Sequence, residues 1–314
     1  MGNPRAERAL MVSGQINGRD ARIRTVAWNP GLAGLLAPSL AVMLLLFGGG
    51  LILGALQALG HLPGAGMTEL TTAHFTRVLF DPDFLTSLGL TFHIALTSTV
   101  IAAIVSVALA LAFTRWAVRS RLVHFVLQVP LTVPHLVVAV AMLFLLAPAG
   151  LVARLAAGAG LIASPGEFPL LVNDRWAIGI LLVYVWKEIP FITLMLLSVL
   201  QNAGGELIEV GRTLKAGPWQ RLRYILLPVI APSLAAACLI VFAFTFGAFE
   251  VPYLLGRTHP MSLPVWAYKS YTDVDLAARP EGIAIGLIIA LVVMGAVALS
   301  VWLNRLAAGR GNWR

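Results

Sequence analysis

Long apolar runs, separated by shorter polar connections, dominate the pattern of this chain. Six of them are near the roughly 20 residues that an α-helix needs to cross about 30 Å of hydrocarbon. They lie at about 32–58, 87–114, 122–148, 177–200, 225–249 and 282–305. We see no strand-like alternation and no internal repeat. The pattern therefore predicts an all-α polytopic membrane protein with six transmembrane helices in one domain, residues 32–306.

Prolines interrupt two of these runs. The third contains Pro130, Pro134 and Pro148, and the fourth contains Pro190. Proline has no N–H group, so it frees a backbone carbonyl that a neighbouring helix or a wet cavity must then satisfy. Helices broken in this way suit a protein with an internal pathway, although packed helix bundles also contain them.

Composition agrees with a membrane protein. Of 314 residues, 59% are hydrophobic and 11% are charged, whereas a soluble domain carries about 25% charged residues. The mean hydropathy is +0.88. The single cysteine, Cys238, excludes a disulfide framework or a cysteine-based metal site.

The distribution of charge predicts the orientation. If the N-terminus is inside, the inner segments are 1–31, 115–121, 201–224 and 306–314, with Arg305 at the border. They hold 15 of the 22 Lys and Arg residues but 4 of the 14 acids. The outer segments, 59–86, 149–176 and 250–281, hold six basic and nine acidic residues. Positive charge favours the cytoplasmic side, so we expect both termini in the cytosol. This orientation accounts for the net charge of +8, so the charge is no evidence for nucleic-acid binding.

The two ends of the chain are polar. Residues 1–31 have no short apolar core of a signal peptide, and we interpret them as a cytosolic N-terminal arm. Residues 307–314 form a cytosolic tail.

Catalytic motifs are missing from the sequence. None of the three lysines follows the glycine pattern of a phosphate-binding loop, and no HExxH, GxSxG or paired-cysteine pattern occurs. The six histidines are scattered over different segments. We therefore expect no enzymatic activity, no metal and no cofactor in this chain. If the protein's activity needs ATP and Mg²⁺, another chain must bind them.

A polar segment, 204–228, interrupts the apolar pattern before the fifth run. Glu206 and Glu209 share one face of a short helix, with Arg212 beside it. Gly217 and Pro218 end that helix and begin a second one. The second helix has an apolar stripe: Trp219, Leu222 and Ile225. This predicts an amphipathic hairpin that docks on a partner, or equally a surface loop whose arginines contact anionic headgroups.

The segment resembles the EAA loop by which permease subunits of ABC importers grip their cytoplasmic ATPases. The matching positions are Glu209, Ile225, Leu227 and Pro228, with the small Gly211 at the second alanine. The chain departs from the pattern at Val210, where the family has alanine, and at Lys215, where it has glycine. The family glycine permits a tight turn, and Gly217 is an alternative source of the bend.

The resemblance extends over roughly residues 30–306. FGAFEVPYLLG (246–256), LPVWAYKSY (263–271) and WKEIPF (186–191) are similar to polyamine-type permeases. It implies a type I, MetI-like permease fold in the bacterial inner membrane. It also implies a cytosolic ATPase dimer, a second and different permease subunit, and a periplasmic binding protein as partners. Spermidine or putrescine is the expected solute; ferric iron, thiamine and phosphonates are the alternatives.

A few polar and aromatic residues are candidates for the substrate pathway. Lys187 and Glu188 lie near the centre of the fourth run, where a charge costs about 2.5–3.5 kcal/mol and usually faces a cavity or a partner. Either a neighbouring helix satisfies each of them, or Glu188 faces the pathway and accepts a cation. Glu250 follows the fifth run among aromatic residues that favour an ammonium ion, or it contacts the binding protein. The further candidates are Tyr184, Phe246 and Tyr253.

The rival hypothesis is a stand-alone secondary transporter or an intramembrane enzyme. The first should contain paired repeats and more buried acids for ion coupling. The second should contain paired acids, a Ser/His pair or a metal cluster. The sequence has none of these patterns.

Overall fold

A computed structural model of the chain describes residues 30–113, 120–201, 211 and 213–311. Throughout these ranges the regular structure is helical, apart from one isolated bridge between Leu62 and Met67. The α-helices are α2 (Pro30–Met43), α3 (Gly49–Ala58), α4 (Ala73–Leu79), α5 (Phe84–Phe113), α6 (Arg121–Thr132), α7 (His135–Leu146), α8 (Leu151–Gly158), α9 (Ile178–Val199), α11 (Pro218–Arg221), α12 (Leu227–Gly247), α13 (Glu250–Leu255), α14 (Leu263–Tyr271) and α15 (Arg279–Gly311). The prediction of an all-α protein is confirmed.

Six helical segments of the described chain are long and apolar enough to cross a membrane. They are Gly34–Ala58, Phe84–Phe113, His135–Gly158, Ile178–Val199, Pro218–Gly247 and Leu276–Leu303. Five of them overlap closely with the predicted runs. Among the described residues, 30–53 form one unit, which contains α2 and the start of α3, and residues from Gly54 onward form a second unit that contains the other helices.

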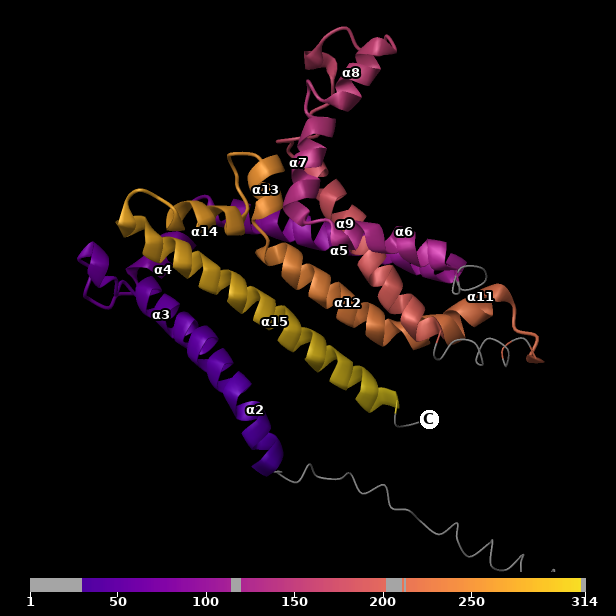
Figure 1. Cartoon of the computed structure of the whole chain (residues 1–314), viewed down its shortest axis with the longest axis horizontal. Coiled ribbons are helices and arrows are strands. Elements are labelled where there is room, and N and C mark those ends of the chain that lie inside the picture. Colours follow the sequence, from indigo (N-terminus) through magenta and orange to yellow (C-terminus); the bar gives the residue numbers. More distant parts are fainter. Residues whose placement is uncertain (1–29, 114–119, 202–210, 212, 312–314) are drawn as a thin grey trace, which may run out of the picture. The chain divides into compact units, whose positions relative to one another are not determined.

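The third predicted run, 122–148, is not one continuous helix. It is divided into α6 and α7 by extended backbone at Val133 and Pro134, and the two helices point in different directions in Figure 1. The residue before a proline is sterically biased toward extended backbone, which explains the break at Val133. The candidate span moves to His135–Gly158.

Helix α9 lies at the centre of the second unit, packed against α5, α6, α7 and α12. Lipid is as apolar as the outer faces of these helices, so the hydrophobic effect does not drive the helices together. Their association depends on close packing and on hydrogen bonds between helices. Small hydroxyl residues on α5 serve both purposes. Ser106, which is fully buried, donates to the carbonyl of Ile189 at 2.9 Å.

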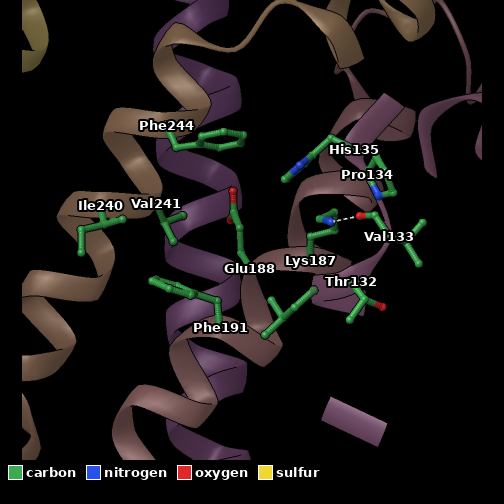
Figure 2. A pocket seen from close by; sticks show the side chains of 11 residues that line it. Thr132, Val133, Pro134, His135, Lys187, Glu188, Phe191, Ile240, Val241 and Phe244 are labelled. Atoms are coloured by element: carbon green, nitrogen blue, oxygen red, sulfur yellow. Dashed lines mark hydrogen bonds between the residues drawn. The ribbon is translucent and has the colours of Figure 1, made fainter. Parts of the chain in front are cut away.

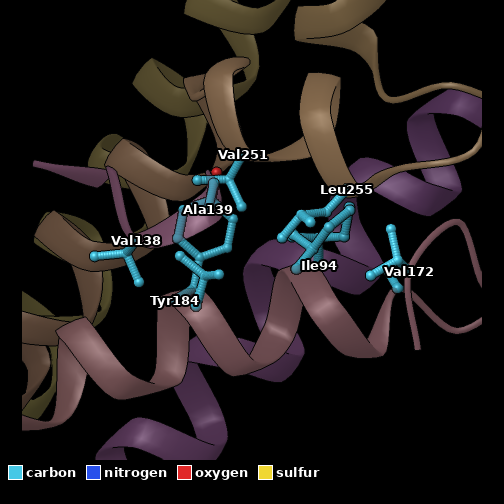
Figure 3. Packing of buried hydrophobic residues seen from close by; sticks show 10 residues of the cluster. Ile94, Val138, Ala139, Val172, Tyr184, Val251 and Leu255 are labelled. Carbon is cyan, nitrogen blue, oxygen red and sulfur yellow. The ribbon is translucent and has the colours of Figure 1, made fainter. Parts of the chain in front are cut away.

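One apolar cluster joins α9 to α5, α7 and α13. Tyr184 lies within it, fully buried, against Val138, Ala139 and Val251 (Figure 3). A second cluster packs the other half of α9, around Ile192 and Leu196, against α5, α6 and α12. The midpoint between the two clusters is occupied by Lys187 and Glu188.

The last long helix is fixed to its neighbours near its N-terminus. A Cβ atom on Gly282 would lie 2.7 Å from the carbonyl oxygen of Ala267, so glycine permits α15 to approach α14 closely. Glu281, also in the first turn of α15, forms an ion pair with Arg77 of α4. These contacts connect α4, α14 and α15 on the side of the chain that we predict to be outside.

Candidate functional site

A cavity of about 350 Å³ lies where α6 and α7 separate, between that break and helices α9 and α12 (Figure 2). Its walls are mainly apolar, with charged groups from α9. The lining residues are Leu131, Thr132, Val133, Pro134, His135, Lys187, Glu188, Phe191, Ile240, Val241 and Phe244. The broken helix therefore creates a wall of this cavity, opposite residues at the centre of the candidate span Ile178–Val199.

Lys187 is paired with the end of α6. Its side chain is 5% exposed, and its Nζ donates to the carbonyl of Pro130 at 3.0 Å and to the carbonyl of Val133. The Pro130 carbonyl has no helical donor because Pro134 lacks an N–H group. A helix C-terminus carries partial negative charge. The ammonium group thus satisfies orphaned carbonyls and complements the dipole of α6.

Glu188 is oriented by hydroxyl groups from two other helices. Its Oε1 accepts from Thr245 Oγ1 of α12 at 2.7 Å and from Ser98 Oγ of α5 at 3.3 Å. The side chain is 5% exposed. Its Oε2 is buried and has no hydrogen-bond partner within the described ranges. In Figure 2 the carboxylate lies between Phe244 and His135, whereas Lys187 points toward Val133.

Aromatic rings cover two sides of the cavity. The rings of His135 and Phe244 have centroids 4.8 Å apart and a tilt of 40°. Phe191 lies one turn after Glu188 on α9 and also lines the space. The cavity therefore combines one partly unsatisfied carboxylate with aromatic walls.

The polar hairpin is closed by local contacts around a left-handed turn. Lys215 has a φ of 53°, a conformation that costs an L-residue about 1–2 kcal/mol. The N–H of Ala216 donates to the carbonyl of Gly211 at 3.0 Å. Gly211 is buried, and a Cβ there would lie 2.7 Å from Cδ1 of Ile225, so the two arms touch at these residues. The turn forms at Lys215; Gly217 has a φ of −65° and caps α11.

The second arm of the hairpin continues into the membrane-spanning helix. We expected a separate short helix, but Pro218–Gly247 is one span in which a π-helical segment, Leu222–Leu226, joins α11 to α12. The π segment ends two residues before Pro228, whose missing N–H prevents regular α-helical hydrogen bonding there. Three large side chains on or next to this arm are strongly exposed: Leu214 (76%), Trp219 (69%) and Tyr224 (71%).

Comparison with known families decides the class of this protein. Residues 102–310 match the family described as "Binding-protein-dependent transport system inner membrane component". The chain belongs to this family. The match includes the helix break, the cavity, the polar hairpin and the last four predicted spans.

Individual relatives agree on the class and differ in what they carry. Over 194 residues the permease is 27% identical to the molybdenum transport system permease protein ModB of Azotobacter vinelandii, covering 61% of this chain and 81% of ModB. Over 97 residues it is 34% identical to the spermidine/putrescine transport system permease protein PotB of Haemophilus influenzae, covering 31% of this chain and 32% of PotB.

A solved structure has the same fold. The permease superposes with a TM-score of 0.73 on a chain of a bacterial alginate ABC transporter, crystallised with an alginate pentasaccharide-bound periplasmic protein. The sequence identity is 19%, and the match covers 88% of this chain and 94% of that one. The predicted MetI-like permease fold is therefore confirmed. The chain is a multi-pass inner-membrane permease subunit of an ABC importer; it is not an enzyme, and ATP is hydrolysed by a separate subunit.

The predicted pathway residues of the permease lie in three places. Lys187 and Glu188 line the cavity. Tyr184 and Phe246 are fully buried in apolar clusters and are not among the cavity-lining residues. Glu250 begins α13, and Tyr253, half exposed, contacts the ring of Tyr268 with centroids 5.5 Å apart. The structure thus brings two of the six candidates together around one space.

The predicted coupling residues are described in part. Glu206, Glu209 and Arg212 lie outside the described residues, so their proposed roles stay predictions. The described members of this set are Gly211, Lys215, Gly217, Ile225, Leu227 and Pro228. Among them, Gly211 and Ile225 are in contact across the hairpin.

Sequence reasoning missed several residues around Glu188. His135, Phe191 and Phe244 line the cavity, and Ser98 and Thr245 donate to the carboxylate. The proline-bounded break before His135 and the spacing of Phe191 from Glu188 were available signals. Ser98 and Thr245 are distant in sequence, and only the packing of α5 and α12 on α9 brings them together.

The left-handed conformation of Lys215 leads to a local prediction. We expect Lys215→Gly to stabilise the turn by about 1 kcal/mol, because glycine adopts a positive φ without a steric penalty. Part of that gain is offset by the greater freedom of glycine in the unfolded chain. Amide hydrogen exchange of residues 213–221 should become slower. Lys215→Ala removes the same charge but keeps the Cβ, so it should give no such protection. Faster exchange in the glycine variant would contradict the assignment of the turn.

Proposed function

We propose that this permease forms half of the transmembrane pathway of a polyamine importer. Its partners would be a second, different permease subunit, a cytosolic ABC ATPase dimer and a periplasmic binding protein that delivers spermidine or putrescine. The observation that carries the solute class is Glu188, a buried carboxylate in an aromatic-walled cavity within the membrane-spanning segments. The match to PotB supports the same class.

The hairpin is proposed to be the contact with the ATPase. Leu214, Trp219 and Tyr224 expose apolar surface beside Arg221 and Arg223. Leu214 precedes the span Pro218–Gly247, and Trp219 and Tyr224 lie in its first two turns, so this apolar surface stands at the proposed cytosolic end of the span, where we propose that a protein partner covers it. The contact between Gly211 and Ile225 joins the hairpin to the helix that continues to Gly247. Closure of the ATPases would then tilt α12 and change the side to which the pathway opens.

The proposed orientation places both termini and the hairpin in the cytosol. It is supported by the excess of Lys and Arg in the inner segments and by the acidic outer segments. The outer surface near Glu250 and Tyr253 would face the periplasmic binding protein. ATP and Mg²⁺ would bind the ATPase subunits, which the permease contacts through residues 204–228.

An anionic solute is the second candidate. The relatives include a molybdenum permease and the structure of an alginate transporter, and Lys187 also lines the cavity. An anion would need the ammonium group to leave the carbonyls of Pro130 and Val133, which would again be unsatisfied. That cost favours the cationic solute.

The partnership is tested by purifying the permease from native membranes in a mild detergent. We expect an ATPase with a phosphate-binding loop to copurify at a fixed ratio and to hydrolyse ATP. Proteoliposomes that hold this complex should take up spermidine or putrescine when the binding protein and ATP are supplied. Molybdate and an acidic oligosaccharide serve as the competing solutes.

The two experiments test the ATPase partner and the solute separately. A complex without an ATPase would contradict the importer and favour a secondary transporter. ATP-driven uptake of molybdate or oligosaccharide, with none of a polyamine, would keep the importer and replace the solute.

A further inference from the structure

The charge of Glu188 has no countercharge in the described chain. Lys187, its neighbour in sequence, donates to the carbonyls of Pro130 and Val133 instead. Adjacent residues on a helix point about 100° apart, so the two side chains separate as they leave α9 (Figure 2). The ion pairs found among the described residues, Arg77 with Glu281 and His259 with Asp83, lie elsewhere.

Only one of the two carboxylate oxygens of Glu188 is satisfied. Thr245 and Ser98 both donate to Oε1, which leaves Oε2 buried without a hydrogen-bond partner in the described ranges. A buried carboxylate of this kind is strongly unfavourable unless a cation or a donor approaches it. The cavity beside it, about 350 Å³, supplies the room.

The walls of the cavity favour an ammonium group over a metal ion. Glu188 is the one carboxylate among the lining residues, and no group of three or more metal-ligating side chains occurs in the described part of the chain. Phe191, Phe244 and His135 present rings, which attract an ammonium ion and cover the methylene groups next to it.

We propose that this cavity binds one primary ammonium group of the transported solute, with Glu188 as its countercharge and Phe244 and Phe191 over its alkyl chain. The assignment rests on the proposed function, because it names a point on the pathway at which a polyamine pauses. Lys187 is held by the end of α6 and leaves the negative charge of Glu188 available. The cavity therefore selects for a positively charged end and an apolar stem.

The test uses the complete transporter in proteoliposomes, with 1,4-diaminobutane as the probe and 1,4-butanediol as its uncharged counterpart. In the wild type, ATP-driven uptake of labelled diaminobutane should not be inhibited by butanediol. Glu188→Gln should reduce that uptake about 30-fold or more, as expected when one partner of a buried charge pair is removed. The variant should melt at the same or a higher temperature than the wild type without solute, because an uncompensated charge is gone.

Two further variants keep the test decisive. Glu69→Gln makes the same chemical change at an exposed carboxylate outside the cavity and should leave uptake unchanged. Phe244→Leu removes a ring but keeps apolar volume, and should reduce uptake about threefold to tenfold. If Glu188→Gln does not assemble into the transporter, Phe244→Leu replaces it as the test of the site.

The failure of this site is distinguishable from the failure of the proposed function. Unchanged diaminobutane uptake in Glu188→Gln, or in Phe244→Leu where the glutamine variant does not assemble, overturns the ammonium site and leaves the importer intact. A protonated, unoccupied Glu188 would give that result. If the wild-type complex takes up no diaminobutane but carries another solute, the polyamine proposal fails, and the ammonium site with it.

Discussion

Replacement of Glu209 by Ala or Arg should lower coupled transport and weaken attachment of the ATPase, while the permease still inserts into the membrane. Glu209 occupies the position of the glutamate in the EAA loop, on the proposed ATPase-facing side of the hairpin. Loss of one charged group at a buried protein interface costs about 2–5 kcal/mol, which corresponds to a loss of affinity of about 30-fold or more. Uptake into proteoliposomes and the amount of ATPase that copurifies should both fall.

A control variant shows whether the loss of ATPase is specific to Glu209. Glu69→Ala removes an exposed carboxylate from a segment predicted to be outside, and should change neither quantity. Membrane insertion should be normal in both variants, because each site is in a polar connection and not in an apolar run. Normal transport by Glu209→Ala would show that the docking role assigned to this face of the hairpin is wrong.

Local patterns were sufficient for most of the candidate membrane-spanning helices. The predicted runs at 177–200 and 87–114 differ from Ile178–Val199 and Phe84–Phe113 by at most three residues at either end. Hydrophobic length is a property of neighbouring residues, so the sequence reports it directly. The third run was misjudged because apolar character continues through Val133 and Pro134, where the backbone is extended. Hydropathy alone does not distinguish one bent span from two helices.

The turn of the hairpin illustrates a second limit of sequence reasoning. The family pattern has glycine where this chain has Lys215, and the bend was equally compatible with Gly217. The structure places the left-handed residue at Lys215, at a φ of 53°. A lysine in that conformation is held by its surroundings, including the hydrogen bond from Ala216 to Gly211. Such surroundings are not encoded in the intrinsic preference of the residue.

The cavity depended on contacts between distant segments. The sequence pointed to Lys187 and Glu188 as buried charges and left open whether helices or a pathway satisfied them. The structure shows that α6 satisfies Lys187, whereas Glu188 accepts from Ser98 and Thr245 and also lines the cavity; its place on a pathway stays a prediction. Which carbonyls meet Lys187 depends on the packing of α6 on α9, more than 50 residues apart in sequence.

Lys187→Met should loosen the break between α6 and α7 and impair transport. The variant keeps an apolar stem but leaves the carbonyls of Pro130 and Val133 without their donor. Each hydrogen bond to a charged group is worth about 1.5–3 kcal/mol, and removal of a buried charge offsets part of the loss. We therefore expect a net destabilisation of about 2 kcal/mol. Amide hydrogen exchange of residues 131–138 should become faster, the melting temperature should fall, and uptake should fall with them.

The local readout separates a positioning role from a general loss of stability. Arg154→Met removes an exposed cation from α8 and should leave both the melting temperature and the exchange of residues 131–138 unchanged. Lys187→Arg keeps the charge, but its planar guanidinium has a different shape, so it should restore the stability in part. If Lys187→Met exchanges and melts like the wild type, the ammonium group does not hold the break. The charge of Lys187 would then be free to act on a solute in the cavity. That result would favour an anionic solute over a polyamine.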